Sequence, residues 1–376
     1  MQFELTEEQK QIQSLTQQFS NNEIRPIAGQ ADQDQKFPMH IYNEAFSLGL
    51  LNSTLPQAYG GAGLGSLELV LITEALCHGC LGIGAALCIN TLAAEPILIA
   101  GTHEQKEKYL TRLTSGAMAS FALTEPSAGS DVASIKTKAI KVPGGYQLTG
   151  SKIWISNANM AEFFVVFAKT NPEAGHKGMS VFIVPADSEG LSVGMPLSKM
   201  GQRAAPACEV FFDNVFVADE QLLGKEGDGF SIAMKVFDHS RPMVAAFGVG
   251  LIQRCLDESL AYAAERESMG KPLFAHQAIA HKLADMRIRL ETARLLTYQA
   301  AWRLDNGFKN TIEASMAKVT AADSAMWAAT EAIQVFGGMG YSTEYPAEKL
   351  FRDAKVLQIY EGTSEIQRNI IARELA

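Results

Sequence analysis

The sequence of 376 residues predicts an α+β chain of three units: an N-terminal helical domain, a middle β-barrel or sandwich domain, and a C-terminal four-helix bundle. A chain of this length is expected to form more than one packed unit. Apolar residues recur at helical spacing near both ends, whereas short β-branched and aromatic runs occupy the middle. The composition, 47% apolar and 19% charged, is typical of a globular chain.

Residues 1–117 carry the signals of helices. Thr6-x-x-Gln9 has the form of a capping box, and apolar residues follow it at helical spacing. A second helix with a polar face is predicted over residues 103–116, where Gly116 is placed to end it. The first domain is therefore predicted to be α-helical.

The stretch LGIGAALCINTLAAEPILIA (81–100) is as long as a membrane span. It contains Asn90, Glu95 and Pro96, and a carboxylate within hydrocarbon costs about 2.5–3.5 kcal/mol even on a lenient insertion scale. We therefore predict a buried helix that breaks at Pro96. No secretory signal opens the sequence, so we expect a cytoplasmic protein of bacterial type without integral membrane segments.

Residues 118–226 change period. Runs such as EFFVVFAKT and GMSVFIVP are rich in β-branched and aromatic residues, and turn sequences such as VPGG and NPEAGHKG separate them. This pattern predicts an all-β domain inserted between two helical parts. Residues 227–376 return to long helical periodicity, with the segment lengths expected of an antiparallel bundle.

Charge and motif content narrow the function classes. The formal net charge is −9 and no basic stripe is present, so a nucleic-acid partner is not expected. The Rossmann, P-loop, GxSxG and HExxH patterns do not occur, which argues against nicotinamide, nucleotide-hydrolysing, serine-hydrolase and zinc-protease chemistry. Seven dispersed histidines give no metal site. Cys77-His78-Gly79-Cys80 lacks a second ligand pair, and we interpret its thiols as packed helical cysteines.

Two stretches of the middle domain suit a flat ligand. In FALTEPSAGSD (121–131) a strand runs into a turn of small residues, whose backbone N–H groups and hydroxyls can approach a ligand; an ordinary hairpin turn is the alternative. In GSKIWISNA (150–158), strand alternation puts Trp154 and Ser156 on one face. An aromatic plane beside a hydroxyl suits a heterocycle, but a core tryptophan with a satisfied N–H is the alternative.

Two stretches of the C-terminal domain mark helix ends. RESMGKPLFAHQAI (266–279) and QVFGGMGYS (334–342) carry an arginine, glutamine amides and bare glycine backbone. These groups suit a pyrophosphate and a purine edge. Two helix C-termini with glycine caps are the alternative interpretation.

QIYEGTSEIQ (358–367) places a carboxylate where solvation is expected to be poor. Glu361 lies between apolar residues and Gly362, and Ser364-x-x-Gln367 reads as a capping box that begins a helix. Burial would raise the pKa of Glu361, whereas the approaching helix N-terminus would lower it.

In this order, FALTEPSAGSDVA, SKIWISNA, QVFGGMGYSTEYPAEKLFRDAK and QIYEGTSEIQRNIIAR closely resemble the acyl-CoA dehydrogenase family of flavoproteins, over essentially the whole chain. The resemblance implies the acyl-CoA dehydrogenase fold, usually assembled as a homotetramer, with FAD held non-covalently at a subunit interface. It also implies the reaction of fatty acid β-oxidation in which an acyl-CoA thioester becomes a trans-2-enoyl-CoA, with electrons passed to electron transfer flavoprotein.

The resemblance also assigns roles to residues of this sequence. Glu361 matches the catalytic base, and its backbone N–H, with a ribityl hydroxyl of FAD, would hold the enolate oxygen. Flavin contacts match Leu123, Thr124, Ser130, Trp154, Ser156, Thr363 and Glu365. Contacts to the FAD of a neighbouring subunit match Arg266, Gln277, Gln334 and Gly338. Substrate contacts match Ser130, Asp238, Arg241, Tyr360 and Gly362.

The sequence departs from the family pattern at two positions: Met269 stands where an aromatic residue is frequent, and Ser156 where threonine is common. Some branches of the family place the glutamate base near FDHSRP (237–242), but this sequence has Asp238 there, which favours Glu361. An oxygen-using relative, such as an oxidase or monooxygenase, and a non-catalytic family member are the alternative functions. Acyl chain length is left open, and the residues expected to set pocket depth are Cys88, Thr91, Leu92 and Glu95, beside Tyr360.

Overall fold

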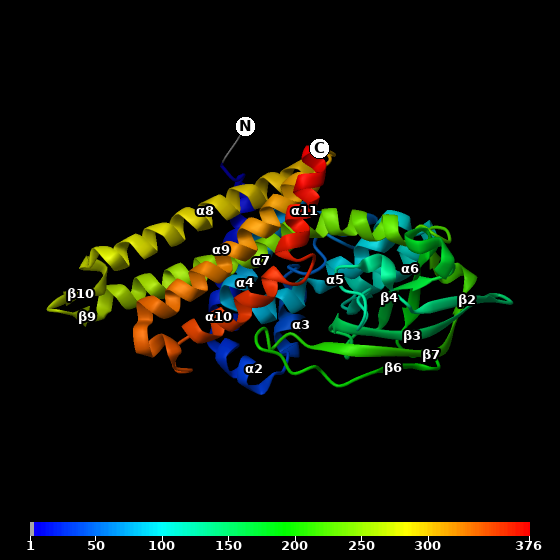
Figure 1. Cartoon of the computed structure of the whole chain (residues 1–376), viewed down its shortest axis with the longest axis horizontal. Helices are drawn as coiled ribbons and strands as arrows, with labels where there is room; N and C mark the ends of the chain where they lie inside the picture. The colour runs from blue at the N-terminus through cyan, green and yellow to red at the C-terminus, as the bar shows by residue number, and fades with distance from the viewer. Residues whose placement is uncertain (1–3) are drawn as a thin grey trace.

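The computed structural model describes residues 4–376, and Figure 1 shows a helical part and a β part next to one another along the long axis. The N-terminal helices are α1 (Glu7–Phe19), α2 (Ala28–Asp34), α3 (Met39–Ser47), α4 (Ser66–Gly79), α5 (Leu81–Ala100) and α6 (His103–Thr114). The predicted capping box of α1 is confirmed, because Thr6 Oγ1 accepts from the Gln9 N–H at 3.2 Å and Gln9 Oε1 accepts from the Thr6 N–H at 3.0 Å.

The middle part is one mixed sheet of eight strands: β1 (Ala119–Ala122), β2 (Lys138–Val142), β3 (Gly145–Ser156), β4 (Phe163–Lys169), β5 (Met179–Pro185), β6 (Leu191–Val193), β7 (Ala207–Ala218) and β8 (Leu222–Leu223). The order is β6-β7-β3-β2-β4-β5-β8, and β1 pairs in parallel with β4. The sheet curls on itself, because the rings of Tyr146 on β3 and Phe182 on β5 lie 4.9 Å apart although two strands separate them in the order. Apolar side chains of both halves fill the interior.

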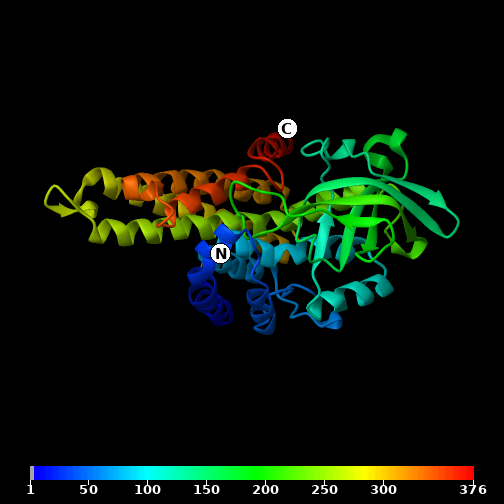
Figure 2. The same cartoon turned by 90° about the horizontal axis from the view of Figure 1, so that it is seen from below.

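The C-terminal part contains three long helices, α7 (Gly229–Glu265), α8 (Gln277–Asp305) and α9 (Thr311–Phe336). Two shorter helices, α10 (Ala347–Lys355) and α11 (Ser364–Leu375), pack on α9 and share the fourth position of the predicted bundle. A hairpin of β9 (Glu267–Ser268) and β10 (Lys271–Pro272) joins α7 to α8 at the end remote from the sheet (Figures 1 and 2). The three-part fold class is thereby confirmed. The domain boundaries after residues 117 and 226 stay predictions.

Helix α5 differs from its prediction. It runs without a break from Leu81 to Ala100 with Pro96 inside it, so the predicted break is wrong. Packing against α4, α7 and β1 stabilises the helix despite the hydrogen bond that proline removes. Among residues 4–376, α5 is the one helix whose length and apolar composition would allow it to cross a membrane, and 67% of its most apolar 18-residue window is buried inside the protein.

The five cysteines are buried and none forms a disulfide. Cys77 lies on α4, but Cys80 has an extended backbone and separates α4 from α5, so the prediction of two helical cysteines holds for one of them. Lys349 Nζ donates to Cys80 Sγ at 3.3 Å. Within residues 4–376, no group of three or more His, Cys, Asp or Glu side chains could hold a metal ion.

Candidate active site

Glu361 lies in the loop of residues 356–363, between α10 and α11. Glu361 has φ +55° and Gly362 has φ +88°, so two consecutive residues adopt the left-handed backbone that favours glycine. Lys318 of α9 donates from Nζ to the Gly362 carbonyl at 2.5 Å. Gln367 of α11 donates from Nε2 to the carbonyls of Glu361 and Gly362 at 3.1 and 3.0 Å. Side chains from two helices therefore hold this unusual turn.

The predicted capping box at Ser364-x-x-Gln367 is wrong by one residue. Thr363 is the N-cap of α11, and its hydroxyl accepts from the Ile366 N–H at 3.2 Å. Ser364 instead donates to Asp323 of α9 at 2.8 Å. Threonine and serine can both cap a helix, so the sequence allows either Thr363 or Ser364 in that role. The sequence alone does not show that the Asp323 carboxylate of α9 binds the Ser364 hydroxyl.

Burial controls the charge state of Glu361. Its Oε2 atom is buried and has no hydrogen-bond partner among residues 4–376. Loss of solvation raises the pKa of Glu361, and the positive charges of Lys318 and Arg241 oppose that rise. Ser240 on α7 also lowers the pKa of Glu361. Two cations, from α7 and α9, thus add to the helix N-terminus that the sequence indicated.

Arg241 forms an ion pair with Asp238 on α7, with Nη1 2.9 Å from Oδ1. Asp238 also accepts from the Thr311 hydroxyl at 2.7 Å, which ties α7 to the start of α9. Arg241 is 4% exposed, and burial lowers its pKa while Asp238 and Glu361 oppose the change. The charge of Arg241 therefore acts on the carboxyl of Glu361 as well as on Asp238. Its predicted contact with CoA, and that of Asp238, stay predictions.

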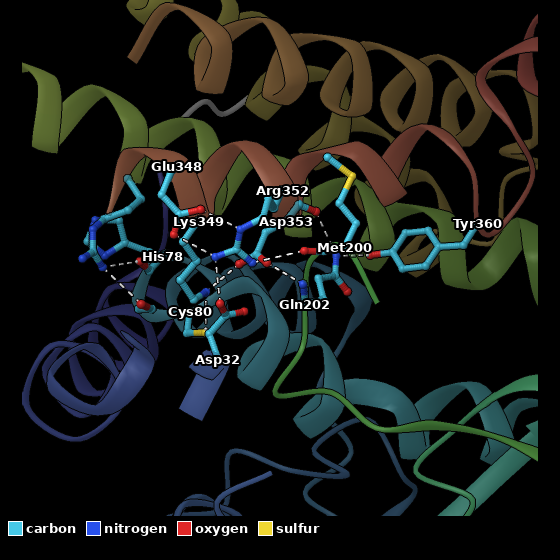
Figure 3. A network of polar contacts seen from close by, with 12 residues as sticks. Asp32, His78, Cys80, Met200, Gln202, Glu348, Lys349, Arg352, Asp353 and Tyr360 are labelled. Atoms are coloured by element: carbon cyan, nitrogen blue, oxygen red, sulfur yellow. Dashed lines mark hydrogen bonds and ion pairs between the residues drawn. The ribbon is translucent and has the colours of Figure 1, made fainter. Parts of the chain in front are cut away.

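A buried polar network holds Tyr360, the residue that precedes Glu361 in the loop (Figure 3). Gln202 Nε2 donates to Tyr360 Oη at 3.4 Å, and the Gln202 N–H donates to Asp353 Oδ1. Asp353 is fully buried and accepts from Lys349 at 2.6 Å. Next to it, Arg352 pairs with Asp32 of α2 and Glu348 of α10. The position of Tyr360 consequently depends on α2, on α10 and on the segment of residues 199–206.

Trp154 lies near the end of β3, where strand alternation is interrupted. The register against β7 shifts between Lys152 and Ile155, and Trp154 has φ +62°. Ile155 stays buried, whereas Trp154 is 54% exposed and Ser156 is partly exposed. The core-tryptophan interpretation is therefore wrong. The bulge instead presents the indole at the surface, where a planar ligand can stack on it.

A buried ion pair between Lys152 and Glu125 fixes the turn that follows β1. Lys152 is fully buried, and its Nζ donates to the Leu123 carbonyl at 3.1 Å and to Glu125 Oε1 at 2.7 Å. The Ile153 N–H donates to the Thr124 carbonyl at 3.0 Å. Burial lowers the pKa of Lys152 to about 8, and Glu125 opposes that shift. Leu123 and Thr124 are thus held against the strand that carries Trp154.

The outer part of the same turn is open. Ser130 is exposed, and a Cβ atom built on Gly129 would meet no atom within 4 Å. Backbone that is free on one side, next to an exposed indole, fits the flat ring system of a flavin. The segment 199–206 reaches this edge, since the Asn157 N–H donates to the Pro206 carbonyl at 2.9 Å. One segment therefore contacts both the Trp154 strand and Tyr360, and it links that strand to the Glu361 loop.

The four residues predicted to contact the FAD of a neighbouring subunit lie at the ends of the long C-terminal helices, away from Trp154. Arg266 caps α7, Gln277 begins α8, and Gln334 and Gly338 lie at the end of α9; all four are exposed. Arg266 follows Arg241 by 25 positions along α7 and its C-cap, which is about 37 Å of helix. Figures 1 and 2 place the hairpin and the β domain at opposite ends of the molecule. Within one chain, these residues are not brought together with Trp154.

Sequence reasoning missed several residues around the site. Lys318 is the most direct, because it contacts Gly362 and lies beside Glu361. Its signal was a lysine within the small-residue run ASMAKVTAA, where a cation that faces the core needs a partner. Predicted contacts Thr363 and Glu365 follow Glu361 directly, the first as the N-cap of α11 and the second exposed on it. Their contact with FAD stays a prediction.

The Gly362 backbone leads to a stability prediction. A Cβ atom at Gly362 would lie 2.4 Å from Gln367 Nε2, and φ +88° is unfavourable for alanine. Gly362→Ala is expected to lower the free energy of unfolding by about 1–2 kcal/mol, because alanine is strained there and Gln367 must leave its carbonyl partners. Thermal unfolding followed by circular dichroism measures this. Gly29→Ala is the matched control, since a Cβ at Gly29 meets nothing within 4 Å. An equal effect of both changes would contradict the prediction.

Comparison with known proteins places the whole chain. Three acyl-CoA dehydrogenase family models match it: the N-terminal domain over residues 6–117, the middle domain over 120–215 and the C-terminal domain over 227–376. A Caenorhabditis briggsae protein, named probable medium-chain specific acyl-CoA dehydrogenase 2, mitochondrial, is 43% identical over 378 residues, which cover 99% of this chain and 91% of that protein.

Solved structures of two other proteins are similar to this chain over at least 99% of its length. Butyryl-CoA dehydrogenase from Megasphaera elsdenii is 38% identical with a TM-score of 0.97 and covers 100% of both chains. The prolyl acyl carrier protein oxidase AnaB is 34% identical with a TM-score of 0.96 and covers 99% of this chain and 100% of that one. With every domain matched in order, and with the helical N-terminal part, the curled sheet and the C-terminal helices in place, the chain belongs to the acyl-CoA dehydrogenase family of FAD-dependent oxidoreductases.

Proposed function

We propose that this enzyme removes the α-proton and the β-hydride of an acyl-CoA thioester to give a trans-2-enoyl-CoA, with Glu361 as the base. The observation that carries the proposal is the Glu361 side chain, whose buried Oε2 has no hydrogen-bond partner among residues 4–376 and whose pKa the charges of Lys318 and Arg241 lower. FAD is the cofactor, and when bound it supplies the acceptor for the hydride.

A general base for this step must be an ionised carboxylate that also has a high affinity for a proton. Burial raises the pKa of Glu361, so the carboxylate accepts a proton more readily than an exposed glutamate would. The cations of Lys318 and Arg241 oppose that rise, and they therefore favour the ionised form that can accept a proton. An unpaired Oε2 leaves one oxygen free for the α-proton. The same side chain is thus both basic and available.

Stabilisation of the enolate oxygen falls to the backbone of the same residue. The left-handed turn at Glu361 and Gly362 leaves the Glu361 N–H without a hydrogen-bond partner among residues 4–376. A donor aimed at a developing oxyanion is commonly worth about 3–4 kcal/mol. One residue would therefore supply a base and a donor on the same side of the substrate.

The cofactor edge is proposed to comprise Trp154 and Ser156 of β3 with Leu123, Thr124 and Ser130 of the adjacent turn. The exposed indole and the open backbone at Gly129 support this assignment. Arg266, Gln277, Gln334 and Gly338 are proposed to serve the FAD of a second copy within a homotetramer. A cytoplasmic role in β-oxidation, with electron transfer flavoprotein as acceptor, completes the proposal.

Anaerobic titration of the FAD-loaded protein with acyl-CoAs of varied length, branching and terminal charge tests this function. Bleaching of the flavin absorbance by at least one of them, with an enoyl-CoA product, is the expected result. No bleaching by any member of the panel would overturn it. Because AnaB is a prolyl acyl carrier protein oxidase, the same reduced protein is then exposed to oxygen. Rapid, stoichiometric hydrogen peroxide release would favour an oxidase, and slow release a dehydrogenase.

A further inference from the structure

Lys318 is a buried cation that the reaction as proposed does not use. It lies on α9 and is 1% exposed, and its Nζ donates to the Gly362 carbonyl at 2.5 Å. An ammonium group has three donors, and its burial is costly unless charge pairing compensates for the lost solvation. Holding one carbonyl does not require a charge, since a neutral amide could donate that hydrogen bond. The retained charge therefore needs a second explanation.

The charges around Lys318 supply that explanation. Glu361 of the loop is its strongest opposite charge, followed by Asp323 on α9 and Glu365 on α11, while Arg241 on α7 repels it. Burial lowers the pKa of Lys318 to about 8, so the ammonium form is still the major one at neutral pH. Asp323 already bonds Gln358, Ser364 and Arg368, and Glu365 is exposed. Glu361 is thus the carboxylate that depends most on Lys318.

We propose that Lys318 is a positioning residue for the base: it fixes the left-handed turn through the Gly362 carbonyl, and its charge keeps the Glu361 carboxylate ionised before the substrate binds. Arg241 acts on Glu361 in the same direction but less strongly than Lys318, and it forms its own ion pair with Asp238 at 2.9 Å. This inference rests on the proposed function for its kinetic test, although the ionisation of Glu361 can be measured without any reaction.

The direction of the pH effect follows from the charges. A nearby cation favours ionised Glu361 and so holds its pKa below the value that burial alone would give. Without Lys318 the pKa of Glu361 therefore rises. Flavin reduction by Lys318→Met is therefore expected to fall about tenfold or more below the new pKa and to recover as the pH rises above it.

The test uses the full-length, FAD-loaded protein and the best acyl-CoA of the titration panel. Single-turnover flavin reduction is measured across pH for Lys318→Met, Lys318→Gln and Lys318→Arg. Gln keeps a donor for the Gly362 carbonyl but removes the charge, so it separates the two roles and carries the test if Met fails to fold. We expect the acidic limb of the pH profile to move to higher pH in Met and Gln and to return towards the original in Arg.

A second readout does not depend on activity. The infrared C=O band of protonated Glu361, identified by its loss in Glu361→Gln, is titrated in each variant without substrate, and the same shift is expected. Lys169→Met is the matched control, because Lys169 is also buried and donates to a loop carbonyl, that of Gly175, in the β domain. A uniform loss of rate at every pH with an unmoved infrared titration would overturn the inference, and so would an equal shift in Lys169→Met. An active Glu361→Gln enzyme would instead overturn the proposed function.

Discussion

Glu361→Gln is expected to slow flavin reduction by acyl-CoA about 10²–10⁴-fold, the range typical of a lost general base. Glutamine keeps the size of the side chain and the backbone N–H, so it removes proton acceptance while the donor to the thioester oxygen stays. Stopped-flow absorbance of the flavin under anaerobic conditions measures the rate. FAD content and the affinity for a non-reducing enoyl-CoA are expected to change little.

Glu107→Gln is the control, because Glu107 is a glutamate exposed on α6. Its flavin reduction is expected to stay within a few-fold of the original. A Glu361→Gln variant that keeps most of its rate would refute Glu361 as the base.

Asp353→Asn is expected to be the most destabilising single change in the network of Figure 3. Asp353 is fully buried and accepts from Lys349 and from the Gln202 N–H. Removing its charge leaves the buried ammonium of Lys349 short of its nearest partner, and breaking a buried pair commonly costs about 3–5 kcal/mol. Chemical denaturation gives the change in free energy of unfolding. Flavin reduction should also slow, because Gln202 would lose the contact that orients it towards Tyr360.

Two comparisons isolate the buried charge as the cause. The double variant Lys349→Met/Asp353→Leu removes both charges and is expected to regain much of the lost stability. Asp219→Asn breaks an exposed pair with Lys141 and is expected to cost less than about 1 kcal/mol. If Asp353→Asn and Asp219→Asn destabilised the protein equally, burial of the network would not be the source of its strength.

The sequence predicts the architecture well because local periodicity reports which face of a segment is buried. The β-branched and aromatic run EFFVVFAKT becomes β4, and the helical spacing after Thr6 becomes α1 with its capping box. The failures are places where tertiary packing overrides a local rule. Pro96 is tolerated in α5 because the helix is buried on several sides, and Thr363 rather than Ser364 caps α11 because Asp323 binds Ser364.

The candidate site is only partly readable from the sequence. Motif resemblance finds Glu361 and Trp154, but physical reasoning from the sequence does not reach their supports, which come from far along the chain. Gln202 and Asp353 are 151 residues apart, and Lys318 and Gly362 are 44 apart. The left-handed backbone of Trp154 and Glu361 was also unexpected, because neither residue type favours it. Such strain is set by the assembled neighbours rather than by local preference.

The distance between the β9–β10 hairpin and the Glu361 loop has a genetic consequence. If the hairpin of one copy binds the cofactor of another, each active site is built from residues of two protein chains. A substitution of Arg266 and a substitution of Glu361 would then damage the contributions of different chains to one active site. Chains that carry one substitution each could therefore complement one another when they assemble into the same oligomer. A cell that makes both defective forms would retain some working centres, although neither form alone would have any.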